Sequence, residues 1–302
     1  MKNPPQTRRV KNVAVITVDK LVKHYGKTKA VAGISFSVKE GEVFGYLGEN
    51  GAGKTTTISC AMDFLRPTSG SISLLGKDAQ KNSVELKQDI GYLSDTLSLH
   101  GKWTGREHIQ FSRKLNGNQD DSAKLVKRLD LDTSIKTGKL SSGNRQKLGI
   151  VLAFMNRPRL LILDEPSAAL DPLMQNALYE LINEAAAREA TVFMSSHNLA
   201  EVEKVCSRVG IIRKGKMIAT EDINALKQKR LHMVTVSFSG QFNKEDFRLE
   251  GVEITEEHPD GLVLSIRGNV QPVLTALSKY KIRSLEVGRA SLESIFLEYY
   301  GA

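Results

Sequence analysis

The stretch from Gly48 to Thr55 (GENGAGKT) constrains this chain more than any other feature, because it fits the phosphate-binding pattern G-x-x-x-x-G-K-[ST]. Glycines without a Cβ atom let the backbone approach a triphosphate closely and turn its N–H groups toward the phosphates. A helix that begins near Lys54 would point its positive end at the same phosphates. We therefore predict that this P-loop binds phosphate through Gly48, Asn50, Gly51, Ala52, Gly53, Lys54, Thr55 and Thr56. Within it, the Lys54 ammonium would reach the β- and γ-phosphates and the Thr55 hydroxyl would bind Mg²⁺.

A strand before the loop and a helix after it supply the context that a P-loop needs. Residues 42–47 (EVFGYL) are typical of a short buried strand, and residues 55–65 of a helix that Pro67 ends. In isolation, a glycine-rich turn that binds nothing would fit the same pattern. The flanking segments favour the phosphate-binding alternative.

Two carboxylates and a histidine follow other predicted strands. Residues 160–163 (LLIL) form a continuous apolar run that predicts a buried parallel strand, and Asp164 and Glu165 come directly after it. His197 follows the predicted strand 191–194 in a similar way. Because α/β sheets bind ligands at the carboxyl ends of their strands, we predict that these three residues share the site of the P-loop. An acidic loop and a surface histidine would be the alternatives if each stood alone.

The composition is that of an ordinary globular protein, and 302 residues predict about two domains. The apolar run 148–155 is far shorter than a membrane span, and the first dozen residues lack the apolar segment of a signal peptide. We expect residues 1–12 to be a disordered basic tail, which contributes to the net charge of +9. Aromatic residues are sparse and nothing resembles an RNA- or DNA-binding module, so we expect no nucleic-acid partner. Cys60 and Cys206 are expected to be buried free thiols, which suits a reducing cytosol.

The remaining pattern predicts two domains of different character. Tyr25 lies in the predicted turn 22–26, about thirty residues before Lys54, where an aromatic ring could stack on a base. An ordinary loop tyrosine would be the alternative if no P-loop followed. From about residue 231 the predicted elements follow a βαββαβ order, with a last helix over 292–300 and no motif that carries chemistry. We therefore predict a nucleotide-binding domain over 13–230 and a small α+β domain over 231–302.

These motifs resemble those of the ATP-binding subunits of ABC transporters, over a span from Val15 to about Lys229. The family's motifs stand in their usual order: Walker A at 48–55, the signature at 140–144, Walker B at 160–165, the D-loop at 168–171 and the switch histidine at 197. The segment from Leu285 to Phe296 is similar to the tail of the ABC-2-type exporter ATPases.

The resemblance implies an α/β fold with a P-loop NTPase domain of the ABC type. Such a domain has a RecA-like core, an antiparallel β subdomain and an α-helical subdomain, here at about 95–157, and a small α+β domain would follow it. ATP and Mg²⁺ are the cofactors that the family implies. The implied roles are Lys54 against phosphate charge, Thr55 and Asp164 on Mg²⁺, Glu165 as general base for water, His197 on the γ-phosphate and Tyr25 on adenine.

The resemblance also implies partners. Two ABC ATPase subunits, identical or related, would form a head-to-tail dimer in which Ser141 and Gly143 of one meet ATP bound to the other, and Asp171 bridges the sites. Separate transmembrane permease subunits would contact the loop 102–104 and the helix from Gly105. The chain would then be a peripheral protein at the cytoplasmic face of the cell membrane, the ATPase of an exporter.

Two positions depart from the family pattern. The signature reads LSSGN, so Ser142 replaces the first glycine and Asn144 the glutamine. The Q-loop position, which should hold Gln or Glu, has Asp95 as its nearest candidate. An aspartate is one methylene shorter, so we expect Asp95 to reach Mg²⁺ through water or by loop movement. Both departures bear on turnover and coupling more than on nucleotide binding.

Two other functions stay open at this point. A soluble ABC ATPase acting on nucleic acid or ribosomes would usually have two cassettes or a long coiled-coil insertion, and this chain has one cassette without sustained heptads. A binding-only module with a degenerate site would not need the intact Glu165 and His197.

Overall fold

The computed structural model describes residues 13–116, 119–228 and 232–289. The chain divides into two compact units after Asp222, and each is described by itself. The boundary expected after residue 230 stays a prediction, because residues 229–231 lie outside the described part. The predicted tail 1–12 and the predicted helix 292–300 lie outside it as well.

A six-stranded sheet forms the centre of the first unit, in the order β10-β9-β3-β8-β7-β6. The five strands from β9 to β6 are parallel, and β10 pairs antiparallel with β9. Every residue of β3, β7 and β8 is buried, as expected for apolar strands covered on both faces. The strands are β3 (Val43–Leu47), β6 (Ile90–Leu93), β7 (Leu160–Asp164), β8 (Thr191–Ser196), β9 (Arg208–Arg213) and β10 (Lys216–Asp222).

An antiparallel sheet packs against this centre, in the order β2-β1-β4-β5. Phe36 from β2 stacks on Phe44, Tyr46 and Phe193 of the central sheet, with ring centroids 5.4–5.8 Å apart. These rings form the apolar layer between the two sheets. The strands are β1 (Ala14–Tyr25), β2 (Thr28–Lys39), β4 (Ser69–Leu74) and β5 (Lys77–Asp78).

The predicted turn at Val22–Gly26 is wrong in its extent, because β1 continues to Tyr25. Tyr25 pairs with Thr28, so the turn is the dipeptide Gly26-Lys27, with Gly26 at a φ of 57°. A left-handed φ favours glycine, and this glycine lets a long bulged strand turn back within two residues.

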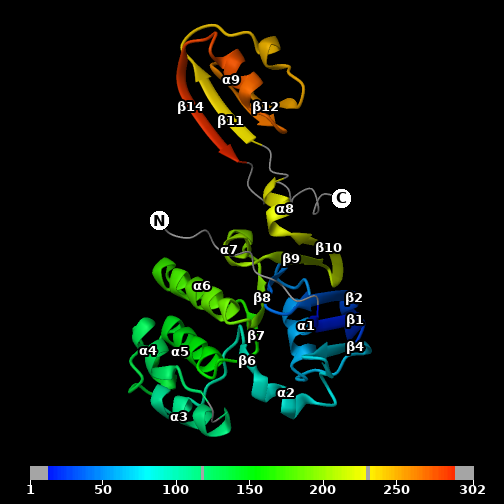
Figure 1. Ribbon diagram of the computed structural model, residues 1–302, viewed down its shortest axis with the longest axis vertical. Coiled ribbons are helices and arrows are strands. Elements are labelled where there is room, and N and C mark those ends of the chain that lie inside the picture. The colour runs from blue at the N-terminus through cyan, green and yellow to red at the C-terminus, as the bar shows by residue number, and fades with distance from the viewer. Residues whose placement is uncertain (1–12, 117–118, 229–231, 290–302) are drawn as a thin grey trace. The chain divides into compact units, whose positions relative to one another are not determined.

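Helices cover the central sheet, and Figure 1 shows α3, α4 and α5 grouped beside β6, away from β1, β2 and β4. Helix α1 ends four residues before the predicted Leu65, because Asp63 takes a left-handed φ of 56°. Thr104 and Glu107 form a capping box at the start of α3, with one hydrogen bond in each direction. The helices are α1 (Lys54–Ala61), α2 (Ser83–Asp89), α3 (Gly105–Asn116), α4 (Ser122–Arg128), α5 (Ser142–Phe154), α6 (Pro172–Ala187) and α7 (Leu199–Val205), with a 3₁₀ turn η1 (Thr137–Lys139).

The second unit contains a four-stranded antiparallel sheet in the order β12-β13-β11-β14. Its core lies between this sheet and α9, around Val236, Phe238 and Phe247. The first helix of the predicted βαββαβ order is only the 3₁₀ turn η2, four residues long, whereas the second is the helix α9. The elements are α8 (Ile223–Gln228), β11 (His232–Phe238), η2 (Lys244–Phe247), β12 (Val252–His258), β13 (Gly261–Ile266), α9 (Gln271–Leu277) and β14 (Ile282–Arg289).

Within the described ranges, no helix has the length and apolar character that crossing a membrane requires. Cys60 and Cys206 are buried and free, as predicted.

Candidate functional site

A cleft of about 420 Å³ lies at the carboxyl ends of β3, β7 and β8. It brings together the P-loop, the Q-loop candidate and two of the residues predicted from strand ends. Its lining consists of Ala30, Glu49, Asn50, Gly51, Gly53, Lys54, Thr55, Thr56, Asp95, Glu165, Ala168 and His197. A second cleft of about 390 Å³, lined in part by Arg157, Arg159 and Arg188, lies at the amino ends of β7 and β8 and contains none of the predicted site residues.

The P-loop glycines are required by close backbone contacts. A Cβ atom on Gly48 would lie 2.4 Å from the Ile212 carbonyl oxygen, and one on Gly53 would lie 2.5 Å from that of Ala30. Gly53 also takes a φ of 110° immediately before α1. Side chains at these two positions would push the loop out of the shape that turns its N–H groups toward a phosphate.

Lys54 is the first residue of α1 and is 5% exposed. Its Nζ donates to the carbonyl oxygen of Gly48 at 2.6 Å and to that of Glu49 at 3.2 Å. The same Nζ lies 3.1 Å from Glu165 Oε1. The P-loop therefore holds a nearly buried positive charge directly beside the carboxylate that follows β7.

Glu165 connects the P-loop to the switch histidine. Its Oε2 lies 2.8 Å from His197 Nδ1, and its backbone N–H donates to Ser195 Oγ at 3.0 Å. Glu165 takes a left-handed φ of 48°, which a non-glycine residue adopts only at a cost in backbone energy. This strained backbone turns the carboxylate from the end of β7 toward Lys54 and His197.

Asp164 is fully buried beneath the cleft. Its Oδ1 accepts from Ser195 Oγ, whereas its buried Oδ2 completes no hydrogen bond. Burial raises the pKa of this carboxyl, the nearby Asp95 and Glu165 carboxylates raise it further, and the Ser195 and Thr55 hydroxyls lower it. An unsatisfied buried carboxylate oxygen is costly, which indicates a site for a positive ligand.

The residues around Asp164 Oδ2 fit Mg²⁺. The Thr55 hydroxyl lies close enough to lower the pKa of Asp164, and Asp95 faces the same cleft. Hydroxyl and carboxylate oxygens are the ligands that Mg²⁺ prefers, usually together with phosphates and water. In the described part of the chain, no three His, Cys, Asp or Glu side chains form a metal site by themselves. Phosphate oxygens would thus be needed to complete the coordination.

Seven predicted site residues are not part of the cleft lining, and Asp164, buried beneath the cleft, is the first of them. Gly48 and Ala52 belong to the P-loop backbone, and Tyr25 is 48% exposed at the end of β1. The other three engage their own helices or a neighbouring loop: Ser141 caps α5, Asp171 caps α6, and Gly143 lies against the Ala169 carbonyl oxygen. The resemblance assigns Ser141, Gly143 and Asp171 to the ATP site of a second subunit.

Ser195 is a site residue that the sequence prediction missed. Its hydroxyl donates to Asp164 and accepts from the N–H of Glu165, so it fixes both carboxylates at the end of β7. The available signal was its place two residues before His197, as a small polar residue that follows the apolar centre of its strand at 192–194. Polar residues in buried strands are uncommon and usually have a specific partner.

Comparison with known proteins identifies the family. The ABC transporter family matches residues 31–168. The bacitracin transport ATP-binding protein BcrA of Bacillus licheniformis is 33% identical over 300 residues, which cover 95% of this chain and 97% of that protein. The chain is an ATP-binding subunit of the ABC transporter family. As an ABC ATPase, it binds and hydrolyses ATP.

Other relatives of this ABC ATPase agree with the assignment. The linearmycin resistance ATP-binding protein LnrL of Bacillus subtilis (strain 168) is 32% identical over 306 residues, 95% of this chain and 98% of that protein. A solved ATP-binding subunit of an ABC transporter superposes with a TM-score of 0.66 at 29% identity, over 71% of this chain and 92% of that one. The predicted fold class is therefore confirmed, and the relatives favour transport over the soluble alternative.

Proposed function

We propose that this ABC ATPase powers export across a membrane through separate permease subunits. It would pair with a second ABC ATPase, identical or related, and act as a peripheral protein at the cytoplasmic face of the cell membrane. The observation that carries the catalytic part is the chain of contacts from Lys54 through Glu165 to His197. The bacitracin transport, linearmycin resistance and Nod factor export functions in the names of its relatives support export.

In the proposed mechanism, the Lys54 ammonium exchanges its contacts with Gly48, Glu49 and Glu165 for phosphate oxygens of ATP. This exchange would free the Glu165 carboxylate to accept the proton of the attacking water. His197, held at 2.8 Å from Glu165, would donate a hydrogen bond to the γ-phosphate. Thr55 and Asp164 would hold Mg²⁺, which supplies positive charge against the phosphate oxygens when bound, and Asp95 would contact its water shell.

The residues that the cleft does not contain support the proposed dimer. Ser141 and Gly143 stand at the start of α5, where N–H groups and the helix dipole attract a phosphate. They and Asp171 would complete the cleft of a second subunit, with Tyr25 stacking on adenine in its own. Ser142 and Asn144 alter the side chains of this helix start but leave Ser141 and Gly143 in place.

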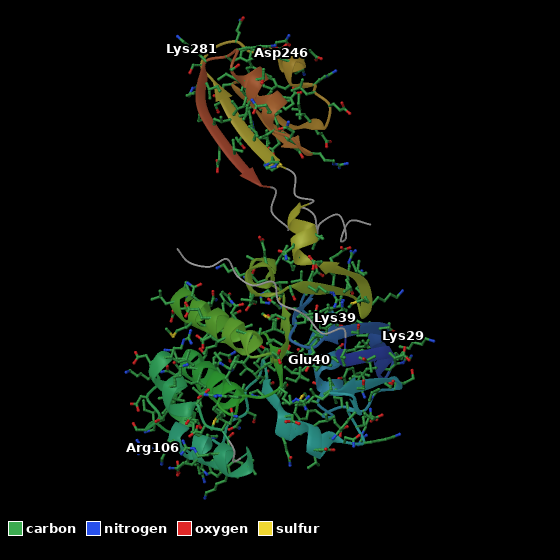
Figure 2. All side chains as sticks on the ribbon, viewed as in Figure 1. Lys29, Lys39, Glu40, Arg106, Asp246 and Lys281 are labelled. Carbon is green, nitrogen blue, oxygen red and sulfur yellow. The ribbon has the colours of Figure 1, made fainter. Side chains whose placement is uncertain are left out.

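Aromatic side chains around Trp103 support a contact with the permease. The Trp103 ring lies 5.1–5.5 Å from the rings of His100, His108 and Phe111. Phe111 and Leu115 of α3 are 50% and 65% exposed. An aromatic anchor beside exposed apolar side chains is typical of a protein interface. Positive charge does not distinguish this surface, because basic side chains also lie elsewhere on the first unit: Lys29 and Arg106 are far apart in Figure 2.

Steady-state ATPase activity of the purified chain with Mg²⁺ tests the catalytic assignment. Glu165→Gln removes the base and keeps the size of the side chain, so kcat should fall by about a hundredfold to ten-thousandfold. The variant should also accumulate an ATP-bound dimer in size-exclusion chromatography. Equal rates for Glu165→Gln and wild type would refute Glu165 as the base.

Transport in membrane vesicles with the cognate permease tests the coupling surface. Trp103→Ala removes the anchor, so transport and the stimulation of ATPase by the permease should fall by about tenfold. Basal ATPase should stay within about twofold, because Trp103 does not line the cleft. Unchanged stimulation would mean that the permease binds elsewhere.

A further inference from the structure

Residues 166–170, here called the connecting segment, join Glu165 to Asp171. Under the proposed function, Glu165 acts in the subunit's own cleft and Asp171 near the partner's. The segment also touches the signature, because a Cβ atom on Gly143 would lie 3.0 Å from the Ala169 carbonyl oxygen. Its position therefore bears on both ATP sites.

A glutamine from the signature helix holds one side of the connecting segment. Gln146 of α5 is 5% exposed, and its Nε2 donates to the Pro166 carbonyl oxygen at 2.9 Å. This hydrogen bond links the helix that begins at the signature to the residue directly after Glu165. Neither the P-loop nor the Mg²⁺ ligands take part in it.

A buried carboxylate lies beside Ser167 of the same segment. Glu201 of α7 is 2% exposed, and its Oε2 accepts from Ser196 Oγ at 2.7 Å. Its Oε1 is buried and completes no hydrogen bond of normal geometry, although the Ser167 hydroxyl lies close enough to lower the pKa of the carboxyl. Burial nevertheless raises that pKa, and the Glu165 carboxylate raises it further, while His197 lowers it.

Ser196 extends this contact to the P-loop and to the switch histidine. Its carbonyl oxygen accepts from the N–H of Gly48 at 3.2 Å, and the next residue is His197. Glu201 therefore contacts Ser196 at the end of β8, next to His197. It also lies beside Ser167 of the connecting segment. A buried carboxylate with an unsatisfied oxygen costs stability, and an apolar side chain would fill the space more favourably. The arrangement therefore points to a role in positioning.

We propose that Gln146 and Glu201 are positioning residues that clamp the connecting segment at Pro166 and Ser167, so that Glu165 and His197 in one site move together with Asp171 and the signature helix that complete the other. This inference rests on the proposed function, including the dimer. It assigns the coupling between two ATP sites to two buried polar side chains that do not line the cleft.

The test compares Gln146→Leu and Glu201→Leu, singly and together, with wild type. Each removes a polar link and keeps a side chain of comparable size. Each single change should lower kcat by about tenfold or more and leave the KM for ATP within about threefold, because a misplacement of about 1 Å costs up to ~100-fold in rate. The Hill coefficient for ATP should fall toward one. The double variant should be no slower than the slower single, because the two residues act on one segment.

A second measurement does not depend on turnover. In a Glu165→Gln background, the two leucine changes should lower the fraction of ATP-bound dimer seen in size-exclusion chromatography, while ATP binding to the monomer in equilibrium dialysis stays unchanged. Glu201→Gln, which keeps an acceptor for Ser196, should retain kcat within about threefold of wild type. If Glu201→Leu does not fold, Ser167→Ala probes the same contact at a half-buried position and should lower the Hill coefficient.

The matched control is Thr191→Val, at the opposite end of β8. Thr191 is 1% exposed and its Oγ1 accepts from the N–H of Gly41 at 3.0 Å, so the change also removes a buried hydrogen bond. The inference would be overturned if Thr191→Val lowered kcat as much as the clamp variants do, or if the losses of kcat in the double variant multiplied. A wild-type Hill coefficient in the clamp variants would overturn it as well. If wild type shows no ATPase and Glu165→Gln no dimer, the proposed function itself has failed instead.

Discussion

The two ends of the central sheet are built from similar turns but satisfy their polar groups differently. Left-handed residues occur at both, with Glu165 at a φ of 48° after β7 and Arg157 at 47° before it. At the carboxyl ends, buried oxygens of Asp164 and Glu201 complete no hydrogen bond, and Glu165 Oε1 is paired with the Lys54 ammonium at 3.1 Å. At the amino ends, Arg157 makes two hydrogen bonds to Asp121. Backbone strain alone therefore does not mark the site, and neither does a single unsatisfied oxygen, because Asn156 Oδ1 before β7 also completes no hydrogen bond. The gathering of several buried carboxylates at the carboxyl ends does mark it.

The loss of ATPase activity should differ most between the two ends of the central sheet when a basic side chain is removed at each end. Lys54→Ala removes the positive charge that faces Glu165 and, when ATP is bound, the phosphates. ATPase activity should fall by about a hundredfold or more, as expected when a preorganised charge on a reacting phosphate is lost. Arg159→Ala at the amino ends removes a charge of the same sign and should change the rate by less than about twofold. Similar losses in both variants would mean that net charge, and not its place, governs the activity.

Neutralisation of the buried aspartate should separate stability from activity. Burial raises the pKa of Asp164, so its charged form destabilises the folded state above that pKa, and the cost is relieved as pH falls through it. Asp164→Asn should therefore raise the thermal midpoint without ligand by about 2–4 °C and weaken the Mg²⁺ dependence of ATPase. The gain should shrink toward acidic pH, where wild-type Asp164 is itself neutral.

Differential scanning fluorimetry at several pH values, with and without Mg-ATP, measures this shift. Ser195→Ala is an informative companion, because it removes the hydroxyl that donates to Asp164 and leaves the charge. Ser195→Ala should lower the thermal midpoint, whereas Asp164→Asn should raise it. A lower midpoint for Asp164→Asn at neutral pH would show that Asp164 stabilises the fold through a contact that outweighs its burial.

The parts of the site that local sequence determines were predictable. The P-loop spacing and the apolar run of β7 each depend on neighbouring residues, and each has the expected structure. Gln146 and Glu201 were not predictable, because their partners Pro166 and Ser196 are set by the packing of separate helices on the sheet. An isolated Gln or Glu in a helix is usually a solvated residue, and only burial shows otherwise.

Non-local pairing also explains the errors in the fold. The extension of β1 to Tyr25 depends on its hairpin with β2, which lets bulged residues stay in the strand. The first helix of the predicted βαββαβ order is reduced to η2, where Asn243 caps a single turn. Neither outcome follows from the periodicity of the segment itself, since pairing and packing override local preference.

The smallest effect should come from the ion pair at the amino ends. Arg157 Nε lies 2.6 Å from Asp121 Oδ2, and hydrogen bonds from Arg157 are the main cause that lowers the pKa of Asp121. The lowered pKa means that the pair stabilises the fold above the ordinary pKa of an aspartate, and that this contribution is lost as pH falls through the lowered value. Arg157→Ala should therefore lower the thermal midpoint slightly near neutral pH, and by less in acid.

Because both side chains are partly in solvent, salt should screen the effect, whereas it should not change the effect of Asp164→Asn at the buried end. The ATPase activity of Arg157→Ala should stay within about twofold of wild type, unlike that of the variants at the carboxyl ends. A large loss of activity would instead place the amino-end cleft among the functional parts of the molecule.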